Sequence, residues 1–212
     1  MNRRDLIRLL PALLLVPVAA RAQPRFEPTA QDRADLTRIE AYLDGLRTLK
    51  ARFLQVAPNG ALAQGEAWLE RPGRMRFQYD PPSPLLLVAG HGLVVFHDKS
   101  LNQTTNIPIG QTPLGILLAD RVRLLGAGVT VTGMQRLPGQ IQVSVVRTAS
   151  PGDGTLTLVF ADNPLALRQW TVLDAQRQET RVTLFNVELG GQFDSKLFEF
   201  IDPRAFQPNP GG

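Results

Sequence analysis

The spacing of hydrophobic residues changes once along the chain. Between Thr29 and Phe53 the apolar positions recur at steps of three and four residues, at Leu36, Ile39, Leu43, Leu46 and Leu49. That spacing places their side chains on one face of an amphipathic helix. Thr29, followed three residues later by Asp32, has the pattern of a capping box and predicts where the helix begins.

Beyond this helix the hydrophobic positions alternate with polar ones. Met75, Phe77 and Tyr79 alternate with polar or charged residues, as in a strand with one apolar and one solvated face. Asn59-Gly60 predicts a two-residue hairpin turn between segments around residues 53–56 and 61–70. Further short strands are predicted at residues 85–89, 93–97, 103–107, 129–134, 141–147, 155–160, 168–173, 180–187 and 198–200.

This succession of strands indicates the fold class. A strand about every ten residues, without helices in between, is typical of an antiparallel sandwich or barrel. The main interruption is at residues 112–119, where Pro113 at a first helical turn predicts a short second helix. A single sheet this long must curl on itself. The first helix is then expected to cover the open mouth of the curled sheet.

The concave face of a curled sheet collects one side chain in two from every strand. Followed across the turns, the alternation assigns ten residues to that face: Met75, Phe77, Tyr79, Phe96, Leu156, Leu158, Phe160, Trp170, Val172 and Phe185. These residues are consistent with an apolar pocket under a lid and equally with a fully packed core. The pattern alone does not choose between the two.

The first residues have the composition of an export signal. Arginines precede an apolar run from residue 9 to residue 20, and Ala20-Arg21-Ala22 is a small-x-small cleavage pattern. We therefore expect a cleaved signal peptide at residues 1–22 and a single mature domain at residues 23–212, located in the periplasm. The pair Arg3-Arg4 leaves both the general secretory route and the twin-arginine route open.

Charge and cysteine content exclude several classes of protein. The chain has 23 basic and 19 acidic residues, a net charge of +4, and without residues 1–22 the counts become 19 and 18, a net charge of +1. Positive and negative residues alternate along the chain without the basic stripe of a nucleic-acid binder, so no nucleic-acid partner is expected. Because the sequence has no cysteine, we do not expect the protein to be a lipoprotein itself.

Residue patterns that would indicate catalysis or a metal site are few. His91 and His97 have only Asp98 as an acidic neighbour, which favours one loop histidine and one strand-end histidine over a metal pair. The sequence has no Gly-x-Ser-x-Gly elbow, His-Glu-x-x-His pair or phosphate-binding glycine loop. We expect no metal, no cofactor and no enzymatic activity. A small hydrolase with two acids brought together by folding is the alternative.

Short motifs follow one another in a fixed order along most of the chain. Residues 46–55 end in Phe53-Leu54-Gln55, and residues 65–79 contain a glycine strand, the turn Arg71-Pro72 and an aromatic strand. Thr112-Pro113-Leu114, Asp174-Ala175-Gln176 and Phe198-Glu199-Phe200 follow. Together these motifs resemble the LolA family of outer-membrane lipoprotein carriers, and the Arg-Pro strand pair is the most specific of them.

The resemblance implies a fold and a role. The fold would be an incomplete antiparallel β-barrel of about eleven strands with a lid of short helices over an apolar cavity. The role would be to receive triacylated lipoproteins from an inner-membrane ABC transporter and to deliver them to an outer-membrane receptor or directly to the outer membrane. Arg71 falls on the family's arginine that hydrogen-bonds the lid and holds the empty cavity shut. We expect the carrier to be a monomer.

The residues and the resemblance together give one hypothesis for the site. The residues expected to contact acyl chains are Met75, Phe77, Tyr79, Phe96, Leu158, Phe160, Trp170 and Phe185. In the empty protein, Arg71 and the helix face of Leu36, Ile39 and Leu43 are expected to fill the hollow until cargo displaces them. An alternative is a periplasmic lipoprotein sensor that uses the same half-barrel to control a membrane signalling protein, although such regulators usually carry an additional domain.

Overall fold

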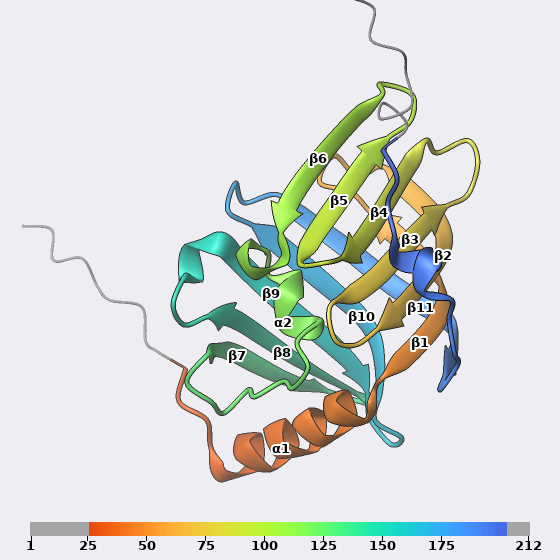
Figure 1. Cartoon of the computed structure of the whole chain (residues 1–212). Coiled ribbons are helices and arrows are strands. Elements are labelled where there is room, and N and C mark those ends of the chain that lie inside the picture. Colours follow the sequence, from red (N-terminus) through yellow and green to blue (C-terminus); the bar gives the residue numbers. More distant parts are fainter. Residues whose placement is uncertain (1–25, 203–212) are drawn as a thin grey trace, which may run out of the picture.

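The computed structural model describes residues 26–202, and within them eleven strands form one antiparallel sheet (Figure 1). The strand order is β6-β5-β4-β3-β2-β1-β11-β10-β9-β8-β7. Because β6 and β7 end this order without pairing to each other, the sheet is open. The predicted fold class, a mainly β protein with an incomplete barrel and a helical lid, is confirmed. The expected export signal at residues 1–22 lies outside the described residues.

About half of the described chain lies in the strands. Their bounds are β1 (Thr48–Val56), β2 (Leu62–Glu70), β3 (Arg74–Tyr79), β4 (Leu85–Gly90), β5 (Leu93–Asp98), β6 (Gln103–Pro108), β7 (Val129–Leu137), β8 (Gln140–Arg147), β9 (Gly154–Ala161), β10 (Ala166–Asp174) and β11 (Glu179–Leu189). The α-helices are α1 (Ala30–Gly45) and α2 (Leu114–Leu117), and the 3₁₀ helices are η1 (Ile109–Gln111), η2 (Pro151–Asp153) and η3 (Ser195–Phe198).

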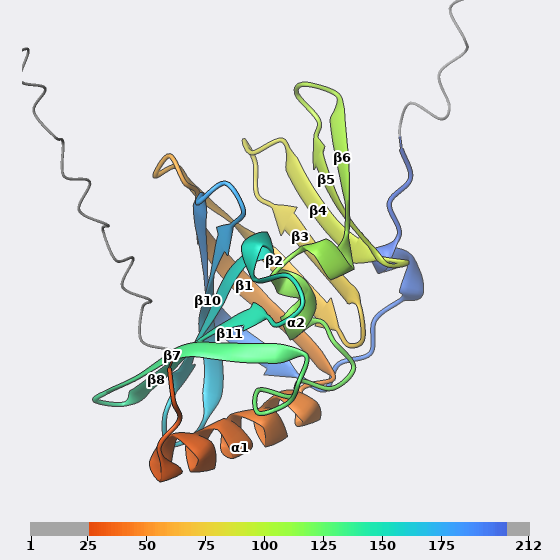
Figure 2. The same cartoon turned by 90° about the vertical axis from the view of Figure 1, so that its left-hand side faces the viewer.

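The two halves of the sheet lie on either side of α2. Figure 2 shows β3 to β6 on one side of this short helix and β7 to β10 on the other, with α1 running across one end of the sheet. No helix among residues 26–202 is long and apolar enough to cross a membrane.

Helix α1 begins at the predicted capping box. The Asp32 backbone N–H donates to Thr29 Oγ1 over 3.1 Å, and the Thr29 N–H donates back to Asp32 Oδ2 over 2.8 Å. The predicted inward face is also confirmed, since Leu36, Ile39 and Leu43 are fully buried. The helix ends at Gly45, however, which is earlier than the hydrophobic spacing indicated.

Two local predictions are wrong. Asn59-Gly60 is part of a five-residue loop at residues 57–61, in which the Ala57 N–H donates to the Ala61 carbonyl over 2.9 Å, so the turn is longer than a two-residue hairpin. The strand predicted at residues 198–200 is absent, and η3 ends there instead. The Asp194 carboxylate accepts from the Lys196 N–H over 2.9 Å and caps this helical turn, so the short apolar segment is held by a local cap.

Candidate functional site

A cavity of about 560 Å³ lies against the inner face of the sheet. Its wall includes six of the residues predicted to face inward: Met75, Phe77, Tyr79, Phe96, Trp170 and Val172. The sequence pattern was consistent with an apolar pocket or with a packed core. The structure has both, because this cavity adjoins a continuous core of buried apolar residues.

Aromatic rings pack against one another in and behind this wall. The Phe77 ring centroid lies 4.6 Å from that of Phe53 and 5.9 Å from that of Trp170. The Tyr79 hydroxyl donates to Gln55 Oε1 over 2.8 Å. Burial raises the pKa of Tyr79 to about 12, so this hydroxyl is neutral at physiological pH. The aromatic part of the wall therefore carries no charge.

Two predicted cavity residues belong to the packed core. Leu158 and Phe160 are fully buried, but they are not among the residues that line the cavity. Phe160 packs edge-on against Tyr42 of α1, with 5.8 Å between the ring centroids. The alternation correctly placed both residues inside the curled sheet, but α1 fills the space above Phe160.

A third predicted cavity residue, Phe185, lies on the wrong face. It is 36% exposed, whereas its neighbour Leu184 is buried. The pairing of β1 with β11 shifts register near this point, and Asn186 has a left-handed backbone with φ of 53°. Val182 and Leu184 are both buried, so the regular alternation of β11 already points Phe185 outward. The bulge that follows inserts one residue and brings Val187 back against the core.

The helix face predicted to fill the hollow is also placed differently. Leu36, Ile39 and Leu43 pack into the core and do not line the cavity. The chain that borders the cavity is instead the segment of η1 and α2, residues 109–118, which we call the mouth segment. Its residues 111–114 line the cavity, together with Asp153 of η2.

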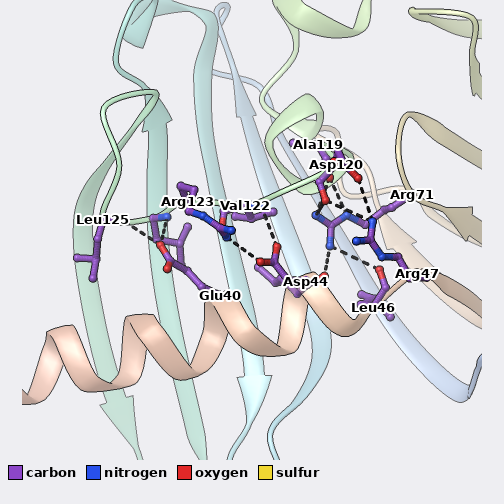
Figure 3. A network of polar contacts seen from close by, with 12 residues as sticks. Glu40, Asp44, Leu46, Arg47, Arg71, Ala119, Asp120, Val122, Arg123 and Leu125 are labelled. Carbon is purple, nitrogen blue, oxygen red and sulfur yellow. Dashed lines mark hydrogen bonds and ion pairs between the residues drawn. The ribbon is translucent and has the colours of Figure 1, made fainter.

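Arg71 ties α1 to the chain that follows the mouth segment (Figure 3). Its side chain is 5% exposed and donates to the Leu43 carbonyl at the end of α1. Its Nε and Nη2 donate to the Ala119 carbonyl over 2.9 Å and 2.5 Å. Burial lowers the pKa of Arg71, while the nearby Asp44 carboxylate opposes that shift. Five fixed donors let one guanidinium bridge two elements, which is the geometry expected of a latch.

The sequence did not indicate a second set of contacts beside Arg71. We call residues 119–125 the strap, because α1 holds them through two acidic side chains (Figure 3). Glu40 accepts the backbone N–H groups of Leu124 and Leu125, the latter over 3.0 Å. Asp44 accepts Arg123 Nη1 over 2.7 Å and the Val122 N–H over 3.3 Å. The four-residue spacing of the two acids shows that they share a helix face, but it does not reveal their partner.

Two of the carboxylates on α1 make the docking of this helix sensitive to acid. Hydrogen bonds from Thr29, with the Arg136 guanidinium 2.7 Å away, hold the pKa of Asp32 below its ordinary value of 3.8. A hydrogen bond from Arg123 likewise lowers the pKa of Asp44. Groups whose pKa is lowered by folding stabilise the fold above their unfolded pKa and lose that contribution as pH falls through the folded pKa.

We therefore expect the free energy of unfolding to fall as pH drops below about 4. Guanidinium titrations at pH 7 and pH 3 would measure the loss. Asp32→Asn should lower stability at pH 7 and show a smaller difference between the two pH values. Glu188→Gln, on the exposed face of β11, is the control. An unchanged pH difference in Asp32→Asn would contradict the assignment.

The two histidines lie in different environments. His97 is buried, its Nδ1 lies 3.0 Å from Thr104 Oγ1, and its ring contacts Phe200 with 5.2 Å between centroids. His91 is an exposed turn residue. Within residues 26–202, no group of three or more histidine, cysteine, aspartate or glutamate residues is arranged to hold a metal ion.

Most of this chain is similar in sequence to known proteins of one family. A family model described as "Outer membrane lipoprotein carrier protein LolA" matches residues 44–201. An outer-membrane lipoprotein carrier protein of Azotobacter vinelandii is 28% identical over 210 residues, which cover 94% of this chain and 97% of that protein. One from Methylococcus capsulatus is 30% identical over 176 residues, covering 79% of this chain and 83% of the relative.

A solved structure shows a weaker likeness. A LolA superfamily protein from Nitrosomonas europaea is 9% identical, with 78% of this chain and 97% of that chain covered. Its TM-score of 0.42 is too low to support a structural argument.

Proposed function

This chain belongs to the LolA family of outer-membrane lipoprotein carriers, and from that premise we propose that it carries triacylated lipoproteins across the periplasm. In this proposal it receives them from an inner-membrane ABC transporter and passes them to an outer-membrane receptor or directly to the outer membrane. The carrier binds one lipoprotein at a time and performs no turnover. The acyl chains enter the cavity bounded by Met75, Phe77, Tyr79, Phe96 and Trp170.

The observation that carries this proposal is the apolar cavity beneath a chain segment tied down by polar contacts. A volume of about 560 Å³ is within the range of pockets that hold one small molecule. Three long acyl chains need more room, so the mouth segment has to move when cargo binds. Lid opening and binding are then coupled, because the contacts that close the lid are lost as the chains enter.

Energetics explain why such a carrier needs a lid that competes with its cargo. Each buried CH₂ contributes about 0.8 kcal/mol, so full burial of three long chains would contribute several tens of kcal/mol. Non-covalent affinity saturates near about −20 kcal/mol, and a carrier that kept such affinity would not release its cargo. Partial coverage of the chains, together with the return of the latch at Arg71, makes transfer to a better acceptor favourable.

Native mass spectrometry of the protein purified from periplasm tests the proposal. We expect a fraction of the protein to carry one acylated lipoprotein in a one-to-one complex. The purified empty protein should also release lipoproteins from spheroplasts. A protein that is always empty and releases none would overturn the carrier assignment, and conversion of any substrate would favour the hydrolase.

A further inference from the structure

A second arginine, Arg147 at the end of β8, holds the other end of the mouth segment. Its Nη2 donates to the Thr112 carbonyl over 2.7 Å and to the Ile109 carbonyl over 3.2 Å. Arg71, by contrast, contacts residues 119 and 120 after α2. The two arginines therefore hold the two ends of one segment. Arg71 lies in the turn between β2 and β3, whereas Arg147 ends β8 in the other half of the sheet order.

Glycine is required where Arg147 meets this segment. A Cβ added at Gly115 would lie 2.3 Å from the Ile109 carbonyl oxygen and 2.7 Å from Arg147 Nη2. Both distances are shorter than van der Waals contact, so a larger residue would disturb the fold of the segment around Ile109 as well as its contact with the guanidinium. The close approach is thus built from three groups: the arginine, the glycine and the carbonyl of residue 109.

The Arg147 guanidinium also has an unused donor. Its Nε is buried and has no hydrogen-bond partner among the described residues. The nearest carboxylate oxygen is Asp153 Oδ2, which lies 3.8 Å away. Asp153 lines the cavity from η2, and Thr112 lines it from the mouth segment. Arg147 therefore lies between two parts of the cavity wall. It donates hydrogen bonds to the mouth segment but lies beyond hydrogen-bonding distance of Asp153.

We propose that Arg147 is a positioning residue that switches partners when cargo enters. In the closed protein it holds the carbonyls of Ile109 and Thr112. When the mouth segment moves away, the guanidinium turns to Asp153, whose carboxylate can accept two of its donors at once. A buried arginine that lost its carbonyls without a replacement would be strongly disfavoured, so Asp153 makes the open form accessible and reversible.

This inference rests on the proposed function for the meaning of the open state, but its first test needs no cargo. Hydrogen exchange of the empty full-length chain, read by mass spectrometry, reports on the mouth segment through the amides of Thr112, Gly115 and Ile116, which bond within it. Arg147→Met should speed their exchange about tenfold and leave strap residues 122–125 unchanged.

Gly115→Ala provides an independent route to the same result, because it displaces the segment while keeping the arginine. Arg181→Met is the matched control, since Arg181 is an exposed arginine paired with Glu179 on β11. Faster exchange throughout the chain, or unchanged exchange in residues 112–118 of both Arg147→Met and Gly115→Ala, would overturn the proposal.

Asp153→Asn distinguishes a switch from a simple structural contact. If Asp153 is the partner in the open form, its loss should slow exchange in residues 112–118 and reduce binding of a fluorescent long-chain fatty acid about tenfold. If Asp153 merely supports Arg147, the same variant should speed exchange, and that outcome would refute the switch. The three variants could show the predicted hydrogen exchange although the protein carries no lipoprotein. That result would reject the proposed carrier function and support the partner switch of Arg147.

Discussion

Cargo release from the Arg71→Leu variant is expected to be about 10- to 100-fold slower than release from the native chain. The guanidinium bonds to the Leu43 and Ala119 carbonyls, and in the proposed function these bonds close the protein. Hydrogen bonds to a charged group contribute about 1.5–3 kcal/mol each, and about 1.4 kcal/mol changes an equilibrium tenfold. The substitution by leucine also removes the cost of burying a charge. The expected change is therefore smaller than the summed free energy of the lost hydrogen bonds.

The measurement is transfer of a bound acylated lipoprotein from the purified carrier to outer-membrane vesicles. Arg74→Leu is the control, because Arg74 lies three residues away and its guanidinium bonds to Glu70 on the surface, over 2.7 Å. Arg71→Lys should release at an intermediate rate, since lysine keeps the charge but lacks the planar fork of donors. Normal release by Arg71→Leu would show that lid closure does not drive transfer.

Local patterns in the sequence predicted the parts of the fold that depend on local interactions. The capping box at Thr29 and Asp32 fixed the start of α1, because both of its hydrogen bonds join residues three apart. The alternation of Met75, Phe77 and Tyr79 predicted three buried side chains in β3, since strand geometry turns every second residue to the same face. No contact from elsewhere in the chain was needed for either prediction.

Predictions failed where the spacing of residues continued across a change of structure. Leu46 and Leu49 continue the helical spacing of α1, yet the helix ends at Gly45 and Leu49 is buried in β1. Spacing alone does not distinguish the last turn of a helix from the first residues of a strand. The prediction for Phe185 failed because apolar residues stand on both faces of β11: Val182 and Leu184 set the inward face, and the bulge at Asn186 changes the alternation beyond Phe185.

The closing contacts could not be predicted because their partners are distant in the sequence. Glu40 accepts backbone donors 84 and 85 residues away, and Arg147 bonds to carbonyls 35 and 38 residues away. A backbone group is the same in every residue type, so the sequence offers no sign of where such a bond will form. Arg71 was identified only because its position next to a proline resembles a family motif.

A substitution in the cavity wall is expected to have the second large effect, on the amount of lipoprotein bound. Phe77→Ser should reduce the fraction of protein that co-purifies with lipoprotein about 100-fold or more, because it puts a hydroxyl and a void where an acyl chain would pack. Phe77 is only 3% exposed and sits between Phe53 and Trp170, so truncation also costs about 3–5 kcal/mol of stability. Loss of cargo by this variant alone would therefore not separate binding from folding.

Two other phenylalanines separate them. Phe96 lines the cavity but is only half-buried, so Phe96→Ser should lose cargo with a smaller loss of stability. Phe185 has the same side chain on the outer face of β11, and Phe185→Ser should keep both. Native mass spectrometry would measure the cargo occupancy of each variant, and chemical unfolding would measure its stability. We expect occupancy to depend on whether the substituted residue lines the cavity and not on the unfolding midpoint. If Phe96→Ser and Phe185→Ser carried equal amounts of lipoprotein, the acyl chains would have to bind elsewhere on the molecule.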